Sequence, residues 1–345
     1  MTRAGDLTTP ALLADAGVLE ANTATMSATR PGPALRPHVK AFKCTALAAR
    51  LAAVGHLGFC CATVREMEGM AVAGLGEDLL LANEIVDPQV ADRLGALVAA
   101  GTRVTVAVDS SETIDVAAAA GIREVLVDVD VGMPRCGCDP ADAGRLADEA
   151  RTAGLTVRGV MGYEGHLQHL VDRVERERRT ARSMAVLTTA HAEVGGEVVS
   201  GGGTGTWDCN DVVTELQAGS FVLMDGDYAR IGLPFAEGLI VLTTTISVRP
   251  GRHAALDGGL KALAMDSGGP QLVNDQGGAA EVLFCSDEHT TVAGGSWTVG
   301  DRVGLRPGHI DPTIAKHRVL HLVDDVTAGS DAEVLESWPV DLRGW

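Results

Sequence analysis

Aromatic side chains are scarce in this sequence of 345 residues: they make up 3% of the chain and include two tyrosines. So few rings exclude a stacking surface for single-stranded nucleic acid. Positive charge is scarce as well, because 28 Lys and Arg residues face 46 Asp and Glu residues and the formal net charge is -18. A chain this acidic is unsuited to coat nucleic acid or an anionic membrane. The sequence therefore predicts a small-molecule partner, with no nucleic acid and no membrane as partners.

Long apolar runs and paired cysteine motifs are also missing. No run approaches 18 uninterrupted apolar residues, and the N-terminal segment MTRAGDLTTPALLADAG lacks the apolar core of a secretory signal. The seven cysteines are odd in number and contain no two CxxC motifs, which argues against a disulfide framework or a zinc knuckle. Cys136 and Cys138 offer a redox pair, but small buried residues in a turn are the simpler interpretation. We expect a cytoplasmic protein with reduced thiols.

Apolar residues are plentiful, at 46% of the chain, which is enough for a large core. From about residue 35 to residue 225, short β-branched runs alternate with Ala-rich amphipathic stretches, a pattern typical of βα units with a parallel sheet. Eight strands are predicted, at 35–39, 58–62, 78–82, 103–108, 124–131, 157–163, 197–200 and 220–224. Helices are predicted within 63–74, 90–101, 111–121 and 139–154. Several of these begin with Ser, Thr or Asp and end with Gly, as capped helices do.

Eight strands with intervening helices predict an α/β fold of the (β/α)8 barrel type, which usually needs about 250 residues. A doubly wound open sheet is the alternative, but no GxGxxG motif follows the first strand. The glycine-rich run SGGGTGT at 200–206 instead follows the seventh strand, where barrels commonly bind phosphate. We therefore expect a barrel over residues 8–238.

After residue 238 the pattern changes to strands separated by Gly, Pro and Asp turns, with almost no helical periodicity. These strands are predicted at 239–248, 281–285, 301–307, 318–323 and 333–340. The sequence therefore predicts a C-terminal all-β domain over residues 239–345, to which residues 1–7 are added.

Barrel enzymes build their sites from the loops that follow the strands. Lys40 follows the first predicted strand, Arg135 the fifth, and Tyr163, His166 and His169 the sixth. A lysine that faces a glycine-rich phosphate cradle is the pairing that pyridoxal phosphate needs, because its aldehyde forms a Schiff base while its phosphate rests on backbone N–H groups. Alone, Lys40 would be most simply an exposed, salt-bridged side chain. Together with the glycine run it favours the cofactor.

In PGHIDPT, His309 and Asp311 are two residues apart, and on an extended strand this spacing places both side chains on one face. An imidazole and a carboxylate suit a divalent ion such as manganese, zinc or magnesium. A turn histidine beside an Asp-Pro pair is the commoner explanation. The SDEH segment at 286–289 offers a second cluster, for which a solvated turn is the simpler interpretation.

Motifs along essentially the whole chain resemble the fold-type III pyridoxal phosphate enzymes, and within them the D-threonine aldolase and D-serine dehydratase branch. The motifs are TPALLAD (9–15), LRPHVKAFK (35–43), DVDVGMPRCG (128–137), GYEGHLQH (162–169), SGGGTGT (200–206), ELQAGSFVLMD (215–225), DGGLKALAMDSG (257–268), SDEH (286–289) and PGHIDPT (307–313). The resemblance implies an alanine racemase-like barrel, a C-terminal β domain and a homodimer.

The resemblance also implies roles for individual residues. Lys40 is implied as the Schiff-base lysine, and Lys43 is not. Near the ring it places Arg135 and Tyr163 beside the phenolic oxygen and Gln217 at the ring nitrogen. For the phosphate it implies Thr204 and the backbone at Gly202, Gly203, Gly219 and Ser220, and for the metal it implies His309 and Asp311.

Three positions depart from the family pattern. Phe42 stands where the family usually has a histidine, and Ala315 where it usually has an asparagine. Glu164, directly after Tyr163, brings an extra charge towards the predicted pocket. We expect these positions to bear on the choice of substrate.

By this resemblance, the chain cleaves a D-β-hydroxy-α-amino acid into glycine and an aldehyde. The metal, with manganese favoured and magnesium or zinc as alternatives, would bind the β-hydroxyl, and His169 is the candidate base. A dehydratase acting on D-serine or D-3-hydroxyaspartate is the alternative, but similar dehydratases tend to carry Cys at the second metal position, where this chain has Asp311.

Two other activities are disfavoured. A racemase would need a tyrosine from the C-terminal domain, whereas both tyrosines, Tyr163 and Tyr228, fall within the predicted barrel. A non-catalytic carrier of pyridoxal phosphate would be a lone barrel without the β domain.

Overall fold

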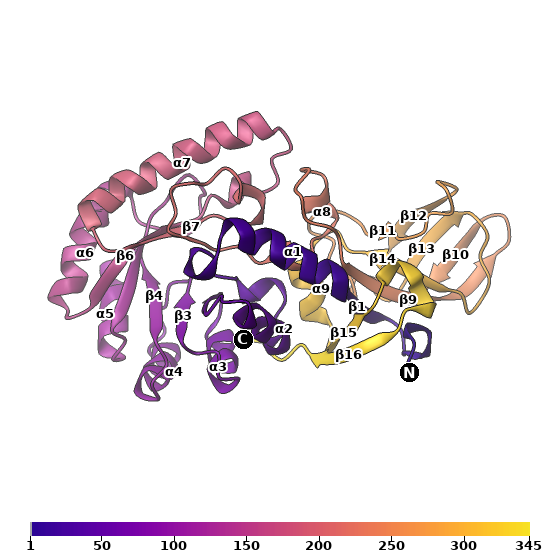
Figure 1. Ribbon diagram of the computed structural model, residues 1–345, viewed down its shortest axis with the longest axis horizontal. Helices are drawn as coiled ribbons and strands as arrows, with labels where there is room; N and C mark the ends of the chain where they lie inside the picture. The colour runs from indigo at the N-terminus through magenta and orange to yellow at the C-terminus, as the bar shows by residue number, and fades with distance from the viewer. Residues whose placement is uncertain (1) are drawn as a thin grey trace. The chain divides into compact units, whose positions relative to one another are not determined.

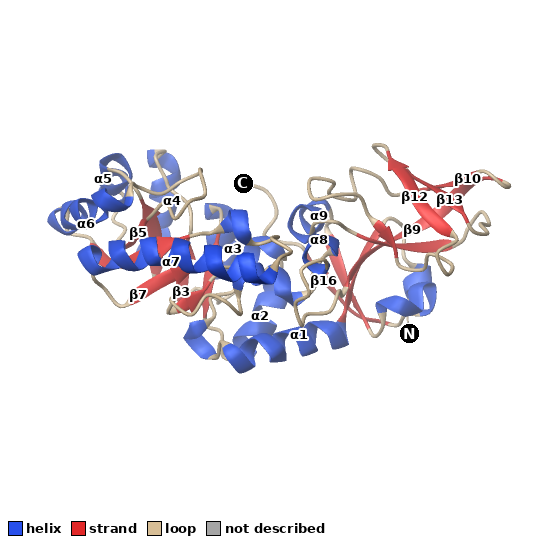
Figure 2. Cartoon of the chain, turned by 90° about the horizontal axis from the view of Figure 1, so that it is seen from above, coloured by secondary structure: helices blue, strands red, loops and turns tan. Residues whose placement is uncertain are grey.

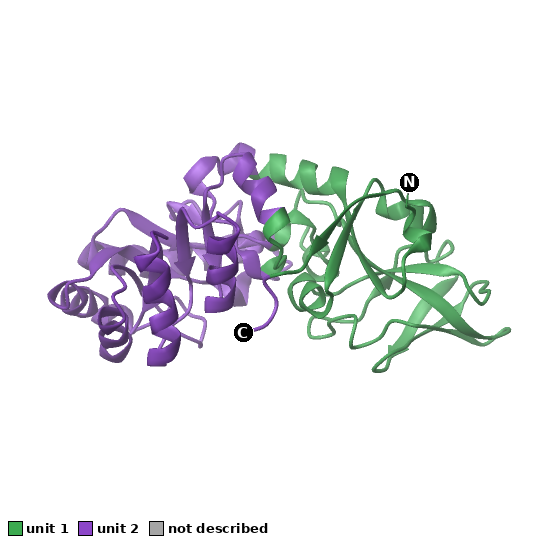
Figure 3. Ribbon diagram, turned by 90° about the horizontal axis from the view of Figure 1, so that it is seen from below, with its two compact units in different colours: residues 1–26, 41–46, 220–341 green, residues 27–40, 47–219, 342–345 purple. Residues whose placement is uncertain are grey.

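The computed structural model describes residues 2–345, which divide into two units (Figure 3). Unit 1 contains the described residues up to Met26, together with residues 41–46 and 220–341. Unit 2 contains residues 27–40, 47–219 and 342–345. Of the predicted segment 1–7, Met1 lies outside the described residues.

Unit 2 is built on a parallel sheet of seven strands in sequence order, shown in magenta and purple in Figure 1. The strands are β2 (Gly58–Cys61), β3 (Asp78–Leu81), β4 (Val104–Val108), β5 (Glu124–Asp128), β6 (Thr156–Gly162), β7 (Val198–Gly201) and β8 (Glu215–Leu216). Isolated parallel bridges join Leu35 to Leu216 of β8 and His38 to Cys60 of β2. Residues 35–38 therefore connect the two edges of the curled sheet, as the predicted alanine racemase-like barrel requires.

Helices alternate with these strands and cover the sheet (Figure 2). They are α2 (Thr45–Ala53), α3 (Val64–Val72), α4 (Pro88–Ala99), α5 (Ser111–Ala119), α6 (Ala143–Thr152) and α7 (Arg173–Val194). Their caps follow the predicted pattern: the side chains of Thr63, Asp87 and Ser110 accept backbone N–H groups of the first turns of α3, α4 and α5. Inside the curl, six strands each contribute one buried side chain, namely Cys60, Leu80, Ala107, Leu126, Met161 and Val198.

Two of the eight predicted barrel strands are wrong. Residues 35–39 form only isolated bridges, since Pro37 has no N–H to donate to a ladder. The predicted strand at 220–224 is a 3-10 turn at Ser220–Val222 followed by Met224, whose φ is 54°. This apolar segment is buried throughout, and periodicity alone cannot tell such a turn from a buried strand. The last strand is instead the short β8.

Unit 1 contains the second sheet, in the order β12-β13-β10-β9-β1-β15-β16, with β14 paired to β9 and β11. The strands are β1 (Ala11–Asp15), β9 (Leu239–Arg249), β10 (His253–Leu256), β11 (Gln271–Leu272), β12 (Ala280–Cys285), β13 (Thr290–Gly294), β14 (Arg302–Arg306), β15 (Val319–Val323) and β16 (Val334–Pro339). Every strand predicted after residue 238 is present. Most neighbours are antiparallel, but β1 runs parallel to β15.

Unit 1 also holds segments that the sequence assigns to the barrel or leaves without structure. β1 belongs to this sheet, where Leu13 packs with Ile240 and Leu242 in a buried cluster. Helix α1 (Ala16–Thr29) begins in unit 1 and ends in unit 2, whereas α8 (Gly226–Ala229) and α9 (Ile310–Lys316) lie within unit 1. The chain thus divides differently from a cut at residue 238.

Tyr228 lies in α8 and is 6% exposed. Its placement among the barrel residues is therefore wrong, because the turn at Ser220–Val222 already belongs to unit 1. A count of tyrosines by sequence position is consequently no argument against a racemase.

The cysteines agree with the simpler interpretation. All seven are free, and Cys60, Cys61 and Cys138 are buried. Burial raises the pKa of the Cys136 thiol to about 11 and that of Cys138 to about 12, so both thiols are protonated near neutral pH. No helix in residues 2–345 is long and apolar enough to cross a membrane.

A buried ion-pair network lies at the seam between β8 and β2. The Arg36 side chain, 4% exposed, donates to Glu215 Oε1 at 2.8 Å and to Asp78 Oδ2 at 2.9 Å. Burial alone would raise the pKa of Asp78, but Arg36 and Arg158 outweigh it and the pKa lies below its ordinary value. Arg36 thus neutralises carboxylates from two strands at the place where the curl closes.

Replacing Arg36 with Met should lower the free energy of unfolding by about 3–5 kcal/mol, because Glu215 and Asp78 lose a buried partner. Replacing Arg145, whose ion pairs on α6 are exposed, should cost less than about 1 kcal/mol. Urea titrations at pH 7 measure both variants. Equal decreases in the free energy of unfolding for Arg36→Met and Arg145→Met would contradict a stabilising role for the ion pairs of Arg36.

Candidate active site

Lys40 lies in a 3-10 turn at Val39–Ala41, immediately after the segment that joins the sheet edges. The backbone N–H of His38 donates to Ala218 O at 3.0 Å, which fixes this segment beside the residues that follow β8. Lys40 Nζ lies 5.8 Å from the ring centroid of Tyr163, and the Arg135 guanidinium carbon lies 5.4 Å from the same centroid. The structure therefore brings together three predicted residues from three separate loops.

The glycine run 201–206 begins with the last residue of β7 and continues into the tight turn that follows it. Gly202 has a φ of +74°, and a Cβ there would lie 2.4 Å from the Leu216 side chain. A Cβ at Gly205 would lie 1.9 Å from the backbone oxygen of Gln168. Side chains are thus excluded at Gly202 and Gly205 by neighbouring atoms and, at Gly202, also by the backbone conformation. The backbone of this turn therefore packs directly on Gln168 and Leu216, and its role in holding a phosphate stays a prediction.

Glu164 is fully buried behind this turn. Its Oε1 accepts the Thr206 hydroxyl at 2.7 Å and the Asn210 amide at 3.0 Å. Gln168 completes the network, because its Nε2 donates to Thr206 Oγ1 at 3.1 Å and its Oε1 accepts the Gly205 N–H at 2.8 Å. Glu164 is therefore bound to the residues that shape the glycine turn.

The predicted role for Glu164, an extra charge directed to the pocket, is replaced by this buried role. Burial raises the pKa of Glu164, and the hydrogen bonds from Thr206 and Asn210 only partly offset that effect. Gln168, Thr206 and Asn210 were not singled out in the sequence, since no local spacing relates them to Glu164. The signal available was that the motifs GYEGHLQH and SGGGTGT both follow neighbouring strands.

The remaining predicted residues of unit 2 lie nearby in the fold. Gln217, directly after β8, donates from Nε2 to Ser200 Oγ at 2.8 Å, and its Oε1 accepts the Cys60 thiol at 3.2 Å. Thr204 is buried at the start of the 3-10 turn Thr204–Thr206. The Gly203 N–H donates to Thr206 Oγ1 at 3.3 Å. The roles of these residues and of Gly219 towards a cofactor stay predictions.

The two histidines after β6 differ in their surroundings. His166 is exposed, and partial desolvation together with the positive charge of Arg179 lowers its pKa. His169 is half-buried and follows Gln168, whose side chain and backbone contact the glycine turn. His169 is thereby attached to the turn through its neighbour, while its role as a base stays a prediction.

His309 and Asp311 do not lie on a strand, so that part of the expectation is wrong. His309 is the N-cap of α9 and Asp311 lies in the first turn of that helix. A proline at the third helical position is compatible with a helix start, because the first-turn N–H groups have no partners within the helix. The SDEH segment is an exposed turn between β12 and β13, as the simpler interpretation expects.

His309 and Asp311 carry an imidazole and a carboxylate, donor types that divalent ions accept. His309 Nδ1 lies 2.6 Å from Asp266 Oδ2, which directs Nε2 elsewhere, and Asp311 Oδ1 accepts the Ser220 hydroxyl at 3.3 Å. Ser220 thus contacts a predicted metal ligand in addition to its predicted phosphate role. Within residues 2–345 no group of three or more His, Cys, Asp or Glu is arranged to hold a metal. An ion here would have two protein ligands and complete its shell with water or substrate.

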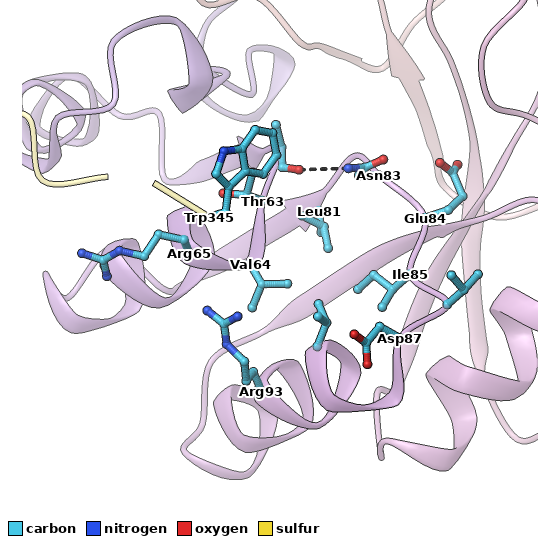
Figure 4. Close-up of a pocket in the computed structure, with 13 residues that line it drawn as sticks. Thr63, Val64, Arg65, Leu81, Asn83, Glu84, Ile85, Asp87, Arg93 and Trp345 are labelled. Carbon is cyan, nitrogen blue, oxygen red and sulfur yellow. Dashed lines mark hydrogen bonds between the residues drawn. The ribbon is translucent and has the colours of Figure 1, made fainter. Parts of the chain in front are cut away.

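A cavity of about 300 Å³ lies at the carboxyl ends of β2 and β3 (Figure 4). Leu81 and Ile85 line it, and Arg93 and Trp345 border it. Arg93 is already paired with Glu68 at 2.7 Å. None of the predicted catalytic or cofactor residues lines this cavity, so it does not belong to the candidate site.

Comparisons with known proteins agree with these features. The family model described as "Alanine racemase, N-terminal domain" matches residues 14–225, and the model described as "Putative serine dehydratase domain" matches residues 238–323. The D-threonine aldolase of Arthrobacter sp and the 3-hydroxy-D-aspartate aldolase of Paracoccus denitrificans (strain Pd 1222) are each 34% identical, over 98% of this chain and 93% of theirs. The crystal structure of D-threonine aldolase from Filomicrobium marinum has a TM-score of 0.91 at 34% identity, covering 99% of this chain and 97% of that one.

Replacing Glu164 with Gln should make the protein relatively more stable as the pH rises. The folded pKa of Glu164 is raised, so the favourable contribution of the neutral acid is present below the unfolded pKa of about 4.3 and is lost as the pH rises through the folded pKa. Glutamine stays neutral and still offers an oxygen to Thr206 and Asn210.

Urea titrations at pH 5 and pH 8 test this, with the exposed Glu112→Gln as the control. The difference in unfolding free energy between Glu164→Gln and wild type should shift in favour of the variant at pH 8, while the control shows no such shift. The same difference in unfolding free energy at both pH values would contradict a raised pKa for the buried Glu164 carboxyl.

Proposed function

Since the chain belongs to the D-threonine aldolase and D-serine dehydratase family of fold-type III pyridoxal phosphate enzymes, we propose that it is a lyase that splits D-β-hydroxy-α-amino acids into glycine and an aldehyde. The observation that carries the proposal is the placement of Lys40 beside Tyr163 and Arg135 in the unit that also forms the glycine turn. The substrate class follows the two aldolases to which nearly the whole chain is similar.

Bound pyridoxal phosphate supplies an aldehyde that reacts with amines and a ring that accepts the electron pair of a bond broken at Cα. Lys40 Nζ would provide the amine that holds the group. Thr204 and the backbone at Gly202, Gly203, Gly219 and Ser220 would hold the phosphate. Arg135 and Tyr163 would hold the phenolic side of the ring, and Gln217 would lie near the ring nitrogen.

His309 and Asp311 would hold the divalent ion, which would supply a Lewis acid that lowers the pKa of a substrate hydroxyl. Manganese is the ion proposed, with magnesium and zinc as alternatives, because a carboxylate ligand is harder than the thiolate that favours zinc. His169 accepts the proton of the β-hydroxyl at its imidazole nitrogen while the Cα–Cβ bond breaks. The carbonyl of the leaving aldehyde forms from that hydroxyl.

A dehydratase is the second candidate, favoured by the match of residues 238–323 to a model described as a putative serine dehydratase domain. In that reaction Lys40 takes the Cα proton and hydroxide leaves the β carbon. Asp311 argues for the aldolase. We further propose that the enzyme acts in the cytoplasm as a homodimer, with the amino acid as its small-molecule partner.

The assay supplies the purified protein with pyridoxal phosphate and Mn²⁺ and follows threonine and 3-hydroxyaspartate by mass spectrometry. We expect glycine from the D enantiomers only, with loss of turnover on chelation. Lys40→Ala should be inactive and lack the visible absorbance of the lysine-bound cofactor, whereas Lys43→Ala should keep that absorbance. Formation of an oxo acid and ammonia without glycine would make the protein a dehydratase. If neither glycine nor an oxo acid formed, a non-catalytic carrier of pyridoxal phosphate would be favoured.

Replacing His169 with Ala should lower kcat by about 10²–10⁴-fold, the usual contribution of a positioned general base. The visible absorbance of the bound cofactor should persist, because Lys40 and the glycine turn remain. His166→Ala is the matched control and should retain turnover, since His166 is exposed. Unchanged turnover of His169→Ala would end its assignment as the base.

A further inference from the structure

The contact between His309 and Asp266 joins residues that are 43 positions apart in the sequence. Their side chains are 27% and 57% exposed, and Nδ1 lies 2.6 Å from Oδ2. A polar contact this accessible contributes at most about 1 kcal/mol to stability. Stability alone therefore does not account for a contact this short and directional, which suggests a role in orienting the imidazole.

A carboxylate at Nδ1 determines which nitrogen of His309 can bind a cation. With the proton on Nδ1 donated to Asp266, the lone pair of Nε2 is left to act as the ligand. Histidines that bind metals commonly donate their second ring N–H to such a carboxylate, which also fixes the orientation of the ring and raises its basicity.

The backbone holds Asp266 and His309 close to each other independently of their side chains. A Cβ at Gly308 would lie 2.5 Å from Gly268 O, so the segment before His309 packs directly on the loop after Asp266. On the other side of Asp266, the Ala264 N–H donates to Thr313 Oγ1 of α9 at 3.0 Å. The loop that carries Asp266 thus lies along the start of α9.

Asp225 binds the backbone at the start of α9. Its Oδ2 accepts the N–H of Ile310, which lies between the two predicted ligands, at 2.8 Å. Its Oδ1 accepts the N–H groups of Asp227 and Tyr228 at the start of α8. The Ser220 hydroxyl holds Asp311, as described above. The side chains of His309 and Asp311 therefore each have a separate supporting group.

We propose that Asp266 is a positioning residue for the divalent ion: it holds His309 with Nε2 directed to the metal and raises the affinity of the site. This inference rests on the proposed function and adds a residue to its metal site. Loss of such a supporting carboxylate typically weakens metal binding by about 10–100-fold. Asp266→Ala should show that loss, and Asp266→Asn, which keeps an oxygen acceptor without the charge, should fall between it and wild type.

The experiment measures Mn²⁺ binding directly. Protein loaded with pyridoxal phosphate is stripped of metal with a chelator, and free Mn²⁺ is followed by electron paramagnetic resonance during titration. Wild type, Asp266→Ala, Asp266→Asn and Asp311→Ala are compared with Glu281→Gln, an exposed carboxylate on β12 in the same unit. Glu281→Gln should bind like wild type. Urea titrations should show nearly equal stability for wild type and both Asp266 variants.

Wild-type affinity in Asp266→Ala would overturn the inference while leaving the proposed metal site intact. Absence of Mn²⁺, Mg²⁺ and Zn²⁺ binding to the wild type would overturn both the metal site and the inference. An equal loss of Mn²⁺ affinity in Asp266→Ala and Glu281→Gln would assign the effect to net charge and would also overturn the inference. A selective and graded loss in the Asp266 variants would support the positioning role.

Discussion

The constraint on which the site depends is the joining of the two sheet edges by residues 35–38. Leu35 bridges to β8 and His38 to β2, so the chain enters the turn of Lys40 at a defined place. Arg36 makes this closure electrostatically stable, because it neutralises Glu215 of the edge strand β8 and Asp78 of β3, the strand next to the other edge. If the edges separated, Lys40 would lose its relation to Tyr163, which follows β6. The buried ion pairs at one end of the strands thus support the chemistry at the other.

Close packing of glycine backbone against neighbouring segments occurs in both units. The turn 201–206 packs on Gln168 and Leu216, and Gly308 packs on the loop that follows Asp266. In both places a side chain would displace the neighbouring element. Buried carboxylates then hold the segments beside these glycines. Glu164 accepts hydrogen bonds from Thr206 and Asn210, and Asp225 accepts one from the N–H of Ile310. The residues proposed for direct chemistry are accordingly few, and each has supporting groups of a different type.

Acidic groups therefore serve different purposes in the two units. Glu164 is buried and has a raised pKa, so its value lies in accepting two hydrogen bonds within the protein. Asp266 is exposed and contacts an imidazole, so its value lies in the orientation and charge it provides. The net charge of -18 reveals neither role. It concerns only partners that a strongly acidic surface would repel.

By itself, the sequence determined the alternation of strands and helices, six of the eight predicted barrel strands, five of the eight strands after residue 238, and the motifs that contain Lys40, Arg135, Tyr163 and the glycine run. Local periodicity and capping are sufficient for these, because each depends on neighbours within one element. Only the tertiary structure decided that 220–222 is a turn, that β1 belongs to the second sheet, that His309 begins a helix, and that Glu164 faces Thr206 while Asp266 faces His309. Those outcomes depend on contacts between segments that lie tens to hundreds of residues apart, and no spacing within one segment encodes which distant side chain it will meet.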